Sequence, residues 1–263
     1  MKAVGTVESL WRYPVKSMAG EALNEAFMGY SGFYGDRCYA FKSSAARKGF
    51  PYLNANVQPQ MLLYRPKFRH PDRAAKPPNL FEAMSITPGV NPANAEPGDL
   101  LLDVETPSGA IISIDDPALL EMLGAGLRGE DRLTLARSDR ALTDCRPVSL
   151  ISLQTVKQVG DELGVPIDKR RFRANIYLNL TTEKGFAEDG LVGRRLRLGT
   201  KAEIAVLERD PRCKMISLDP DTCEQNPAIL RKVAQAHGAD AGVYCAVLVE
   251  GMISLGDVVE LIG

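Results

Sequence analysis

The sequence predicts a mixed, β-rich α+β fold, built as a two-part β-barrel architecture with a few peripheral helices. Three observations lead to this prediction. Short segments in which apolar and polar residues alternate recur from the N-terminus onward, as expected of half-buried strands. Helical spacing of apolar residues is hard to find before residue 115 and infrequent after it. Two further alternating segments close the chain, and this predominance of strands favours a barrel over a doubly wound sheet.

The first part of the chain is expected to form one domain, over residues 1–118, of strands and turns. A turn at Thr106-Pro107-Ser108-Gly109 predicts a hairpin between two of its strands. Residues 59–97 contain 8 of the 17 prolines, so this stretch is predicted to be a long irregular insertion. Such a loop acts either as a binding loop or as a mobile connection. The predicted strands cover residues 3–10, 37–41, 61–64, 100–104 and 110–114.

The second domain is expected over residues 119–263. A short helix over 117–123, with Pro117 at its first position, leads into it. Ser152 is a good N-cap for a helix in which apolar residues follow helical spacing up to residue 163. A third helix is predicted over 227–236, ended by Gly238. The predicted strands cover residues 132–136, 147–151, 175–180, 202–207, 243–249 and 258–262.

Composition and charge exclude several classes of protein. The 263 residues are 45% hydrophobic and 25% charged, which is ordinary globular composition. Lys and Arg number 32 against 33 Asp and Glu, so no basic excess points to a nucleic-acid partner. No apolar run approaches the roughly 20 residues of a membrane span. The first residues lack the apolar core of a signal peptide, and a cytoplasmic location is therefore expected.

The residue types available for chemistry are few. Two histidines disfavour a His-rich metal site and a Ser-His-Asp triad. The five cysteines are odd in number and lack C-x-x-C spacing, which argues against a disulfide framework or an all-cysteine zinc site. Sequence motifs for dinucleotides, nucleotides, zincins and serine hydrolases are absent. Any chemistry must therefore use Cys, Arg, Lys and carboxylate side chains, or a bound cofactor.

Three basic clusters lie at the edges of predicted strands. Tyr13-Pro14-Val15-Lys16-Ser17 combines an ammonium with a hydroxyl and suits a phosphate, or is a plain turn with a solvated lysine. In Gly35-Asp36-Arg37 the arginine either holds phosphate or pairs with its neighbouring aspartate. The third cluster is Arg170-Arg171-Phe172-Arg173-Ala174-Asn175. Its guanidinium groups and amide suit an anionic, nitrogen-rich ring. The alternative is that its charges protect the edge of a strand from pairing with another chain.

A fourth cluster surrounds Cys213, which follows a proline turn between Arg212 and Lys214. Neighbouring cations favour the thiolate, which is both a nucleophile and a metal ligand. The alternative is that Cys213 is a small apolar residue, as most single cysteines are. Cys38 and Cys245 fall within apolar strands and are predicted to belong to the core.

Taken together and in order, these clusters resemble the MOSC (molybdenum cofactor sulfurase C-terminal) domain family with its N-terminal β-barrel companion domain. The resemblance covers essentially the whole chain, and the best-understood of the similar proteins are the amidoxime reducing component family. Where relatives often carry Thr-Ala-Arg-Gln, this chain has Asn54-Ala55-Asn56-Val57, and Ala174 and Cys223 replace Pro and Gly. The matching segments are Tyr13-Pro14-Val15-Lys16-Ser17, Gly35-Asp36-Arg37, Arg171-Phe172-Arg173-Ala174-Asn175, Arg212-Cys213, Asp219-Pro220-Asp221-Thr222 and Gly256-Asp257-Val258-Val259.

The resemblance implies a molybdenum cofactor (Mo-molybdopterin) and a role for each matching residue. Lys16, Ser17 and Arg37 would hold the molybdopterin phosphate. Cys213 would be the catalytic residue and would bind the molybdenum ion through its thiolate. The further cofactor contacts would be Ser152, Arg173, Asn175, Arg212 and Tyr244.

The resemblance also implies an oxidoreductase that reduces small N-hydroxylated compounds. Electrons would come from a separate protein of the ferredoxin, flavoprotein or cytochrome type. A carrier that holds the cofactor or a sulfur atom on Cys213 without turnover is the alternative function. A β-barrel binding domain that has lost the cofactor is a third possibility.

Overall fold

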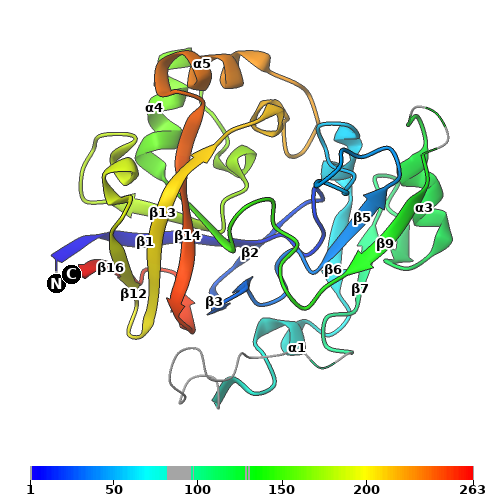
Figure 1. The fold of residues 1–263 in the computed structure, drawn as a ribbon, viewed down its shortest axis with the longest axis horizontal. Helices are drawn as coiled ribbons and strands as arrows, with labels where there is room; N and C mark the ends of the chain where they lie inside the picture. The colour runs from blue at the N-terminus through cyan, green and yellow to red at the C-terminus, as the bar shows by residue number, and fades with distance from the viewer. Residues whose placement is uncertain (1, 82–95, 97, 128, 130, 263) are drawn as a thin grey trace.

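Seven strands close into a barrel in the computed structural model, which describes residues 2–81, 96, 98–127, 129 and 131–262 (Figure 1). The strand order is β11-β10-β14-β13-β12-β16-β1, and β1 closes the barrel by pairing with β11. This confirms the predicted β-rich α+β fold. The barrel strands are β1 (Lys2–Arg12), β10 (Val148–Ser152), β11 (Ile176–Leu180), β12 (Arg195–Leu198), β13 (Ala202–Pro211), β14 (Asp240–Val249) and β16 (Val258–Ile262).

Strand β1 comes from the start of the chain, whereas the other six barrel strands lie after residue 147. It is antiparallel to both of its barrel neighbours, with Gly5 opposite Leu180 in β11 and Lys2 opposite Leu261 in β16. A Cβ at Gly5 would lie 2.5 Å from the Asn179 carbonyl oxygen, so glycine permits the close approach of β1 and β11. The two chain ends consequently lie side by side (Figure 1).

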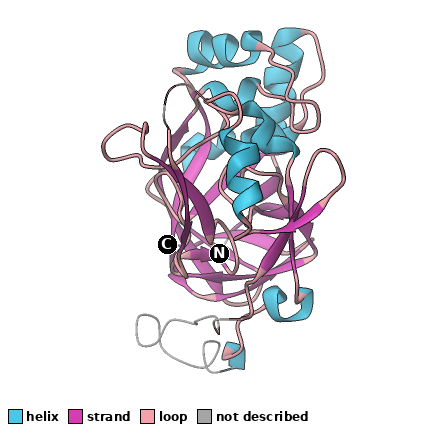
Figure 2. Ribbon diagram, turned by 90° about the vertical axis from the view of Figure 1, so that its right-hand side faces the viewer, coloured by secondary structure: helices cyan, strands magenta, loops and turns pink. Residues whose placement is uncertain are grey.

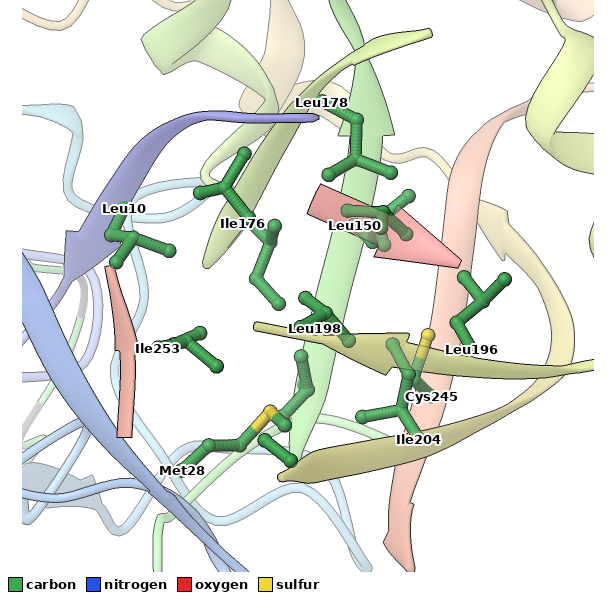
Figure 3. Close-up of a cluster of buried hydrophobic side chains, with 14 of the residues drawn as sticks. Leu10, Met28, Leu150, Ile176, Leu178, Leu196, Leu198, Ile204, Cys245 and Ile253 are labelled. Carbon is green, nitrogen blue, oxygen red and sulfur yellow. The ribbon is translucent and has the colours of Figure 1, made fainter. Parts of the chain in front are cut away.

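Alternate side chains of the barrel strands fill its interior, as the period of two along a strand requires. Leu10, Leu150, Ile176 and Leu196 have no exposed surface and belong to one cluster of side chains inside the barrel (Figure 3). Cys245 lies in the same interior and Cys38 is also buried, as predicted for both. Strands β3 (Glu25–Gly29), β4 (Gly32–Phe33) and β15 (Gly251–Ser254) form a small sheet that contributes to this core.

A second hydrophobic core lies in the part of the molecule to the right in Figure 1. Here β5 (Tyr39–Ser43) pairs with β9 (Leu133–Arg137), and three other strands form a separate sheet. Helix α3 (Pro117–Gly124) packs against it, and Asp116 caps this helix by accepting from Ala118 N. The other strands of this part are β6 (Arg65–Phe68), β7 (Leu102–Glu105) and β8 (Ile111–Ser113). Strand β2 (Glu21–Leu23) instead extends the barrel sheet by pairing with the end of β1.

Helices α4 (Leu153–Leu163) and α5 (Pro227–His237) pack together at one end of the molecule, at the top of Figure 2. Helix α4 connects β10 to β11, a parallel pair that needs such a crossover. The 3-10 helices η2 (Lys169–Phe172), η3 (Ala187–Leu191) and η4 (Lys214–Ser217) lie in the same half of the chain. Of the helices in the described ranges, none is both long and apolar enough to span a membrane.

Two sequence predictions differ from the structure. Residues 61–64 were expected to form a strand, but Pro59–Leu63 is the 3-10 helix η1, with proline in its first turn. The Met61 and Tyr64 amides donate to carbonyls three residues earlier instead of to another strand. The expected irregular insertion contains regular structure, because β6 pairs with β7 and is followed by α1 (Pro71–Ala75). Residues 82–95 and 97 of that stretch lie outside the described residues.

The Ser152 cap of α4 generates a stability prediction. Its hydroxyl accepts from Thr155 N at 3.1 Å and donates to the Glu188 carboxylate at 2.7 Å, and Ser152 and Glu188 have no exposed surface. Ser152→Ala should lower the free energy of unfolding in urea by about 3 kcal/mol, because a cap and a bond to a buried carboxylate are both lost. Asn226→Ala, at the exposed cap of α5, should cost only about 1 kcal/mol. Equal losses would contradict this assignment.

Candidate functional site

A cleft of about 960 Å³ opens where the segment 43–57 faces the end of the barrel. Its lining is strongly basic, with eight Lys or Arg side chains against three Asp side chains. Among the lining residues are eight of the nine predicted site residues, which come from segments far apart in the sequence. They are Lys16, Ser17, Arg37, Arg173, Asn175, Arg212, Cys213 and Tyr244.

Ser152 is the predicted site residue that does not line this cleft. It is fully buried, and its backbone N–H and hydroxyl both donate to Glu188. The same hydroxyl starts helix α4, so the side chain has no group left to present to a ligand in the cleft. The N-cap predicted from sequence is confirmed, whereas the structure does not bring Ser152 together with the other predicted site residues.

Tyr13 does not line the cleft itself, but its ring contacts two of the arginines that do. Its ring is 4.8 Å from the Arg37 guanidinium carbon and 4.2 Å from that of Arg173. Stacking of this kind is favourable because the face of an aromatic ring is electronegative. The Tyr13 N–H donates to the Asp36 carboxylate at 2.8 Å, and the Arg37 N–H donates to the Tyr13 carbonyl at 2.7 Å. A Cβ at Gly20 would lie 2.5 Å from the ring, so glycine there lets the backbone pass.

The two arginines on Tyr13 differ in how their charge is balanced. Arg37 forms an ion pair with the buried Asp36 and donates to the Arg173 carbonyl at 3.2 Å. Arg173 forms no ion pair with any carboxylate in the described part of the chain. Burial, together with the nearby Arg37, lowers the pKa of Arg173 to about 10. Arg173 therefore remains charged at neutral pH, and its half-buried guanidinium, which no carboxylate balances, is a place for an anion.

Three of the residues brought together here have left-handed backbone conformations: Ser17 (φ 66°), Arg37 (φ 45°) and Arg173 (φ 51°). This conformation costs a non-glycine residue about 1 kcal/mol or more. Arg173 is consequently not on strand β11 but at the end of η2, one turn before the strand. Strain concentrated in one cleft is typical of a functional site.

Lys16 is only 5% exposed, although it carries a charge. Its ammonium donates to the Leu142 carbonyl at 3.0 Å and forms an ion pair with Asp144. Burial lowers the pKa of Lys16, partly offset by Asp144. Rings of Phe50 and Tyr52 lie 5.6 and 5.4 Å away, which confines the ammonium to the cleft wall.

Asn175 and Arg212 line the cleft, but most of their polar groups are hydrogen-bonded within the protein itself. Asn175 accepts from the Ser149 N–H at 3.2 Å and donates to the Trp11 carbonyl at 3.3 Å. Arg212 donates to the carbonyls of Ala241 (2.6 Å) and Phe172 (2.9 Å). These bonds fix the segments that carry Arg173 and Cys213. Asn175 and Arg212 therefore have a structural role in the site, in addition to any contact with a ligand.

Cys213 follows the end of β13 and precedes η4, with an exposed side chain. The Asn56 side-chain amide lies 3.5 Å from its sulfur, and the Lys214 ammonium donates to the Asn56 carbonyl at 3.2 Å. The segment 54–57, noted above as different from its counterpart in relatives, thus meets the cysteine directly. Cys145 is also exposed in the cleft, where its thiol faces Glu208 at 3.6 Å.

Two contributors to the site were missed in the sequence. Tyr13 was noted only as part of a motif, because nothing local indicates that two distant arginines stack on it. Asp210 lines the cleft at 2% exposure, pairs with Arg212 at 2.8 Å and is hydrogen-bonded to Tyr244. Burial raises the pKa of Asp210 to about 6, and burial also raises the pKa of the Tyr244 hydroxyl. The alternation along β13, extended past residue 207, would have indicated an inward Asp210.

Comparison with protein-family models identifies two domains in this chain. The family model of the MOSC domain matches residues 137–260, and the family model of the MOSC N-terminal beta barrel domain matches residues 4–77. MOSC domains are known in molybdenum-cofactor-binding proteins. Lys16 and Arg37 fall in the N-terminal match, whereas Arg173 and Cys213 fall in the MOSC match.

Solved structures similar to this chain include the YUAD protein from Bacillus subtilis, at 14% identity and a TM-score of 0.49, covering 98% of this chain and 95% of that one. YiiM from Geobacillus stearothermophilus aligns at 22% identity and a TM-score of 0.36, over 45% of this chain and 55% of that one. No curated protein matches the sequence.

Asp210 predicts a specific pH dependence of stability. Its pKa of about 6 in the folded protein exceeds the roughly 3.9 of an unfolded aspartate, so the folded state binds the proton more tightly. The stability that this proton contributes is complete below about pH 4 and is lost as the pH rises through 6. Asp210→Asn should abolish this loss, which we expect to be about 2 kcal/mol between pH 4.5 and 7 in urea unfolding.

The exposed Glu224→Gln variant serves as the control, with a pH curve parallel to that of the wild type. Parallel curves for wild type and Asp210→Asn would contradict the assignment.

Proposed function

Because this chain carries a MOSC domain behind a MOSC N-terminal β-barrel domain, we propose that its cleft binds the molybdenum cofactor and that the protein reduces small N-hydroxylated compounds. The observation that carries the proposal is the Arg173 guanidinium, which is half-buried, has no carboxylate partner among the described residues and lines the same cleft as the exposed Cys213 thiol. A phosphate-bearing, electron-rich pterin supplies the missing negative charge. A thiolate supplies the soft ligand that molybdenum prefers.

Each part of the cofactor has a fitting set of residues in the cleft. Lys16, Ser17 and Arg37 would hold the phosphate, since a charge-assisted contact suits its oxygens. Arg173 would face the pterin, with Asn175 and Tyr244 beside it. Cys213 would be the protein ligand of the metal. When bound, the cofactor would supply the two-electron chemistry of N–O bond cleavage.

The chain's own contribution to the reaction is to bind the substrate and to move protons. Reduction of an N-hydroxyl group to N–H consumes two electrons and two protons and releases one water. The electrons would come from a separate electron-transfer protein, of ferredoxin, flavoprotein or cytochrome type. Asp210, whose pKa of about 6 makes it a proton donor near neutrality, would supply a proton to the departing oxygen, and Tyr244 would orient its carboxyl group.

A carrier function is the second candidate, and the exposure of Cys213 is the observation that favours it. A sulfur atom or a cofactor held at an exposed thiol is accessible to a receiving protein. Both functions predict molybdenum in protein purified from a cofactor-competent host, measured by elemental analysis. Turnover of benzamidoxime with a chemical reductant separates them, because a carrier would hold molybdenum without reducing the compound.

Cys213→Ser should abolish molybdenum-dependent reduction while the unfolding free energy changes little. The substitution replaces a soft donor with a hard one at an exposed position that fills no core volume. Cys223→Ser is the matched control, since its sulfur lies outside the cleft against the Pro59 carbonyl and should be dispensable for reduction. Full reductase activity of Cys213→Ser protein would refute the role of this cysteine.

Arg173→Lys should release cofactor. A lysine keeps the charge but loses the planar fork that stacks on Tyr13, and the loss of a strong charge-assisted contact weakens binding about tenfold or more. Molybdenum and pterin retained per protein after gel filtration measure the effect. Arg170→Lys, at an arginine that pairs with Asp168 and Asp221 outside the cleft, should retain both. Equal retention by the two variants would be the adverse result.

A further inference from the structure

The segment 43–57 forms one wall of the cleft, and the cofactor contacts proposed above use none of it. Nearly all of its residues line the cleft, from Ser43 at the end of β5 to Val57. The middle of the segment reaches Lys16, whose ammonium is 5.6 Å from the Phe50 ring. Its C-terminal end reaches Cys213 through Asn56. The wall therefore runs from the proposed phosphate contacts to the proposed metal ligand.

This wall is held in place by hydrogen bonds rather than lying loose on the surface. Asp131 accepts from the Ser43 hydroxyl at 2.7 Å, the Ser44 hydroxyl at 3.1 Å and the Ala45 N–H at 3.2 Å. The Ser43 N–H donates to the Pro51 carbonyl at 2.9 Å, which closes the loop between them. Side chains at the tip of the loop are thereby presented from a fixed base.

Arg47 and Lys48 are the charged side chains of this tip, and both are exposed. Five other cations of the cleft have carboxylate partners, in the pairs Lys16–Asp144, Arg37–Asp36, Arg146–Glu208, Arg171–Asp219 and Arg212–Asp210. Within the described ranges no ion pair involves Arg47, Lys48 or Arg173. Two places in the cleft therefore carry positive charge without a carboxylate partner: one at the half-buried Arg173, and one at the exposed Arg47 and Lys48.

Apolar side chains flank the charged rim. Phe50 is 39% exposed and Val57 is 64% exposed, and both line the cleft. Exposed apolar side chains that line a binding cleft are suited to the flat body of a small molecule, and polar groups beside them can fix its orientation. An aromatic ring resting on Phe50 and Val57 would lie between the cations of the tip and the Cys213 end.

We infer that the wall 43–57 is the substrate-binding surface and that the substrates are N-hydroxylated aromatic compounds bearing a carboxylate or phosphate group. The inference rests on the function proposed above and adds the substrate class to it. The ring contacts Phe50 and Val57, and the anionic group meets Arg47 and Lys48. The N-hydroxyl group at the other end of the molecule is then directed toward Cys213.

The test compares benzamidoxime with its 4-carboxy derivative on molybdenum-loaded protein. For the wild type, the carboxylated compound should have a KM about fivefold lower, the gain expected from contacts with two exposed cations. Arg47→Gln/Lys48→Gln should bring the ratio of the two KM values close to one. The control Lys184→Gln/Arg231→Gln removes the same charge from exposed cations outside the cleft and should preserve the wild-type ratio.

Equal KM values in the wild type, or an unchanged ratio in Arg47→Gln/Lys48→Gln, would overturn the inference. It would also be overturned if that variant needed more of an acidic electron-donor protein while still discriminating between the substrates. The cations would then bind the donor instead.

Failure of the proposed function gives a different result, in which neither compound is reduced. Calorimetric binding of benzamidine and 4-carboxybenzamidine, which needs no turnover, then tests the inference. The carboxylated compound should have a Kd about fivefold lower for the wild type. The ratio of the two Kd values should be close to one for Arg47→Gln/Lys48→Gln.

Discussion

The contact of two guanidinium groups with the ring of Tyr13 is the constraint on which the site depends. Two like charges held together on one ring, both half-buried, repel each other, and this arrangement persists because several other interactions oppose the repulsion. The aromatic face attracts both cations, Asp36 balances one of them, and the left-handed backbone of Arg37 and Arg173 sets the approach of each. The remaining charge on Arg173 is left for a ligand. The site is therefore preorganised for an anion.

This contact also joins the two matched domains. Tyr13 and Arg37 belong to the N-terminal match and Arg173 to the MOSC match, while β1 of the first part completes the barrel of the second. Asn56 and Cys213 form a second junction, at the other end of the cleft. A ligand in this cleft touches both parts of the chain. We therefore regard the cleft, rather than either domain, as the unit that carries function.

Local patterns predicted much of the fold and the composition of the site. Alternation located β1, the hairpin of β7 and β8, and most barrel strands, and capping residues located α3, α4 and α5. The strand predicted at 61–64 is wrong because apolar content alone does not separate a strand from a 3-10 turn. The basic clusters do converge, but which arginine keeps an unbalanced charge depends on partners such as Asp36 and Asp210. Asp36 is adjacent to Arg37 in sequence, whereas contacts such as Tyr13 with Arg173 join residues far apart, which local spacing does not encode.

The closure of the barrel by β1 has a consequence for how the molecule is made. Strand β1 is synthesised before its barrel partners β11 and β16, whose paired residues lie 166 to 259 positions later in the chain. Until then β1 has an unpaired edge, which is the kind of surface that promotes aggregation of nascent chains. Because Tyr13 directly follows β1, the cleft cannot assemble until the barrel closes. A product terminated before β11 and β16 would therefore lack both the closed barrel and the assembled cleft.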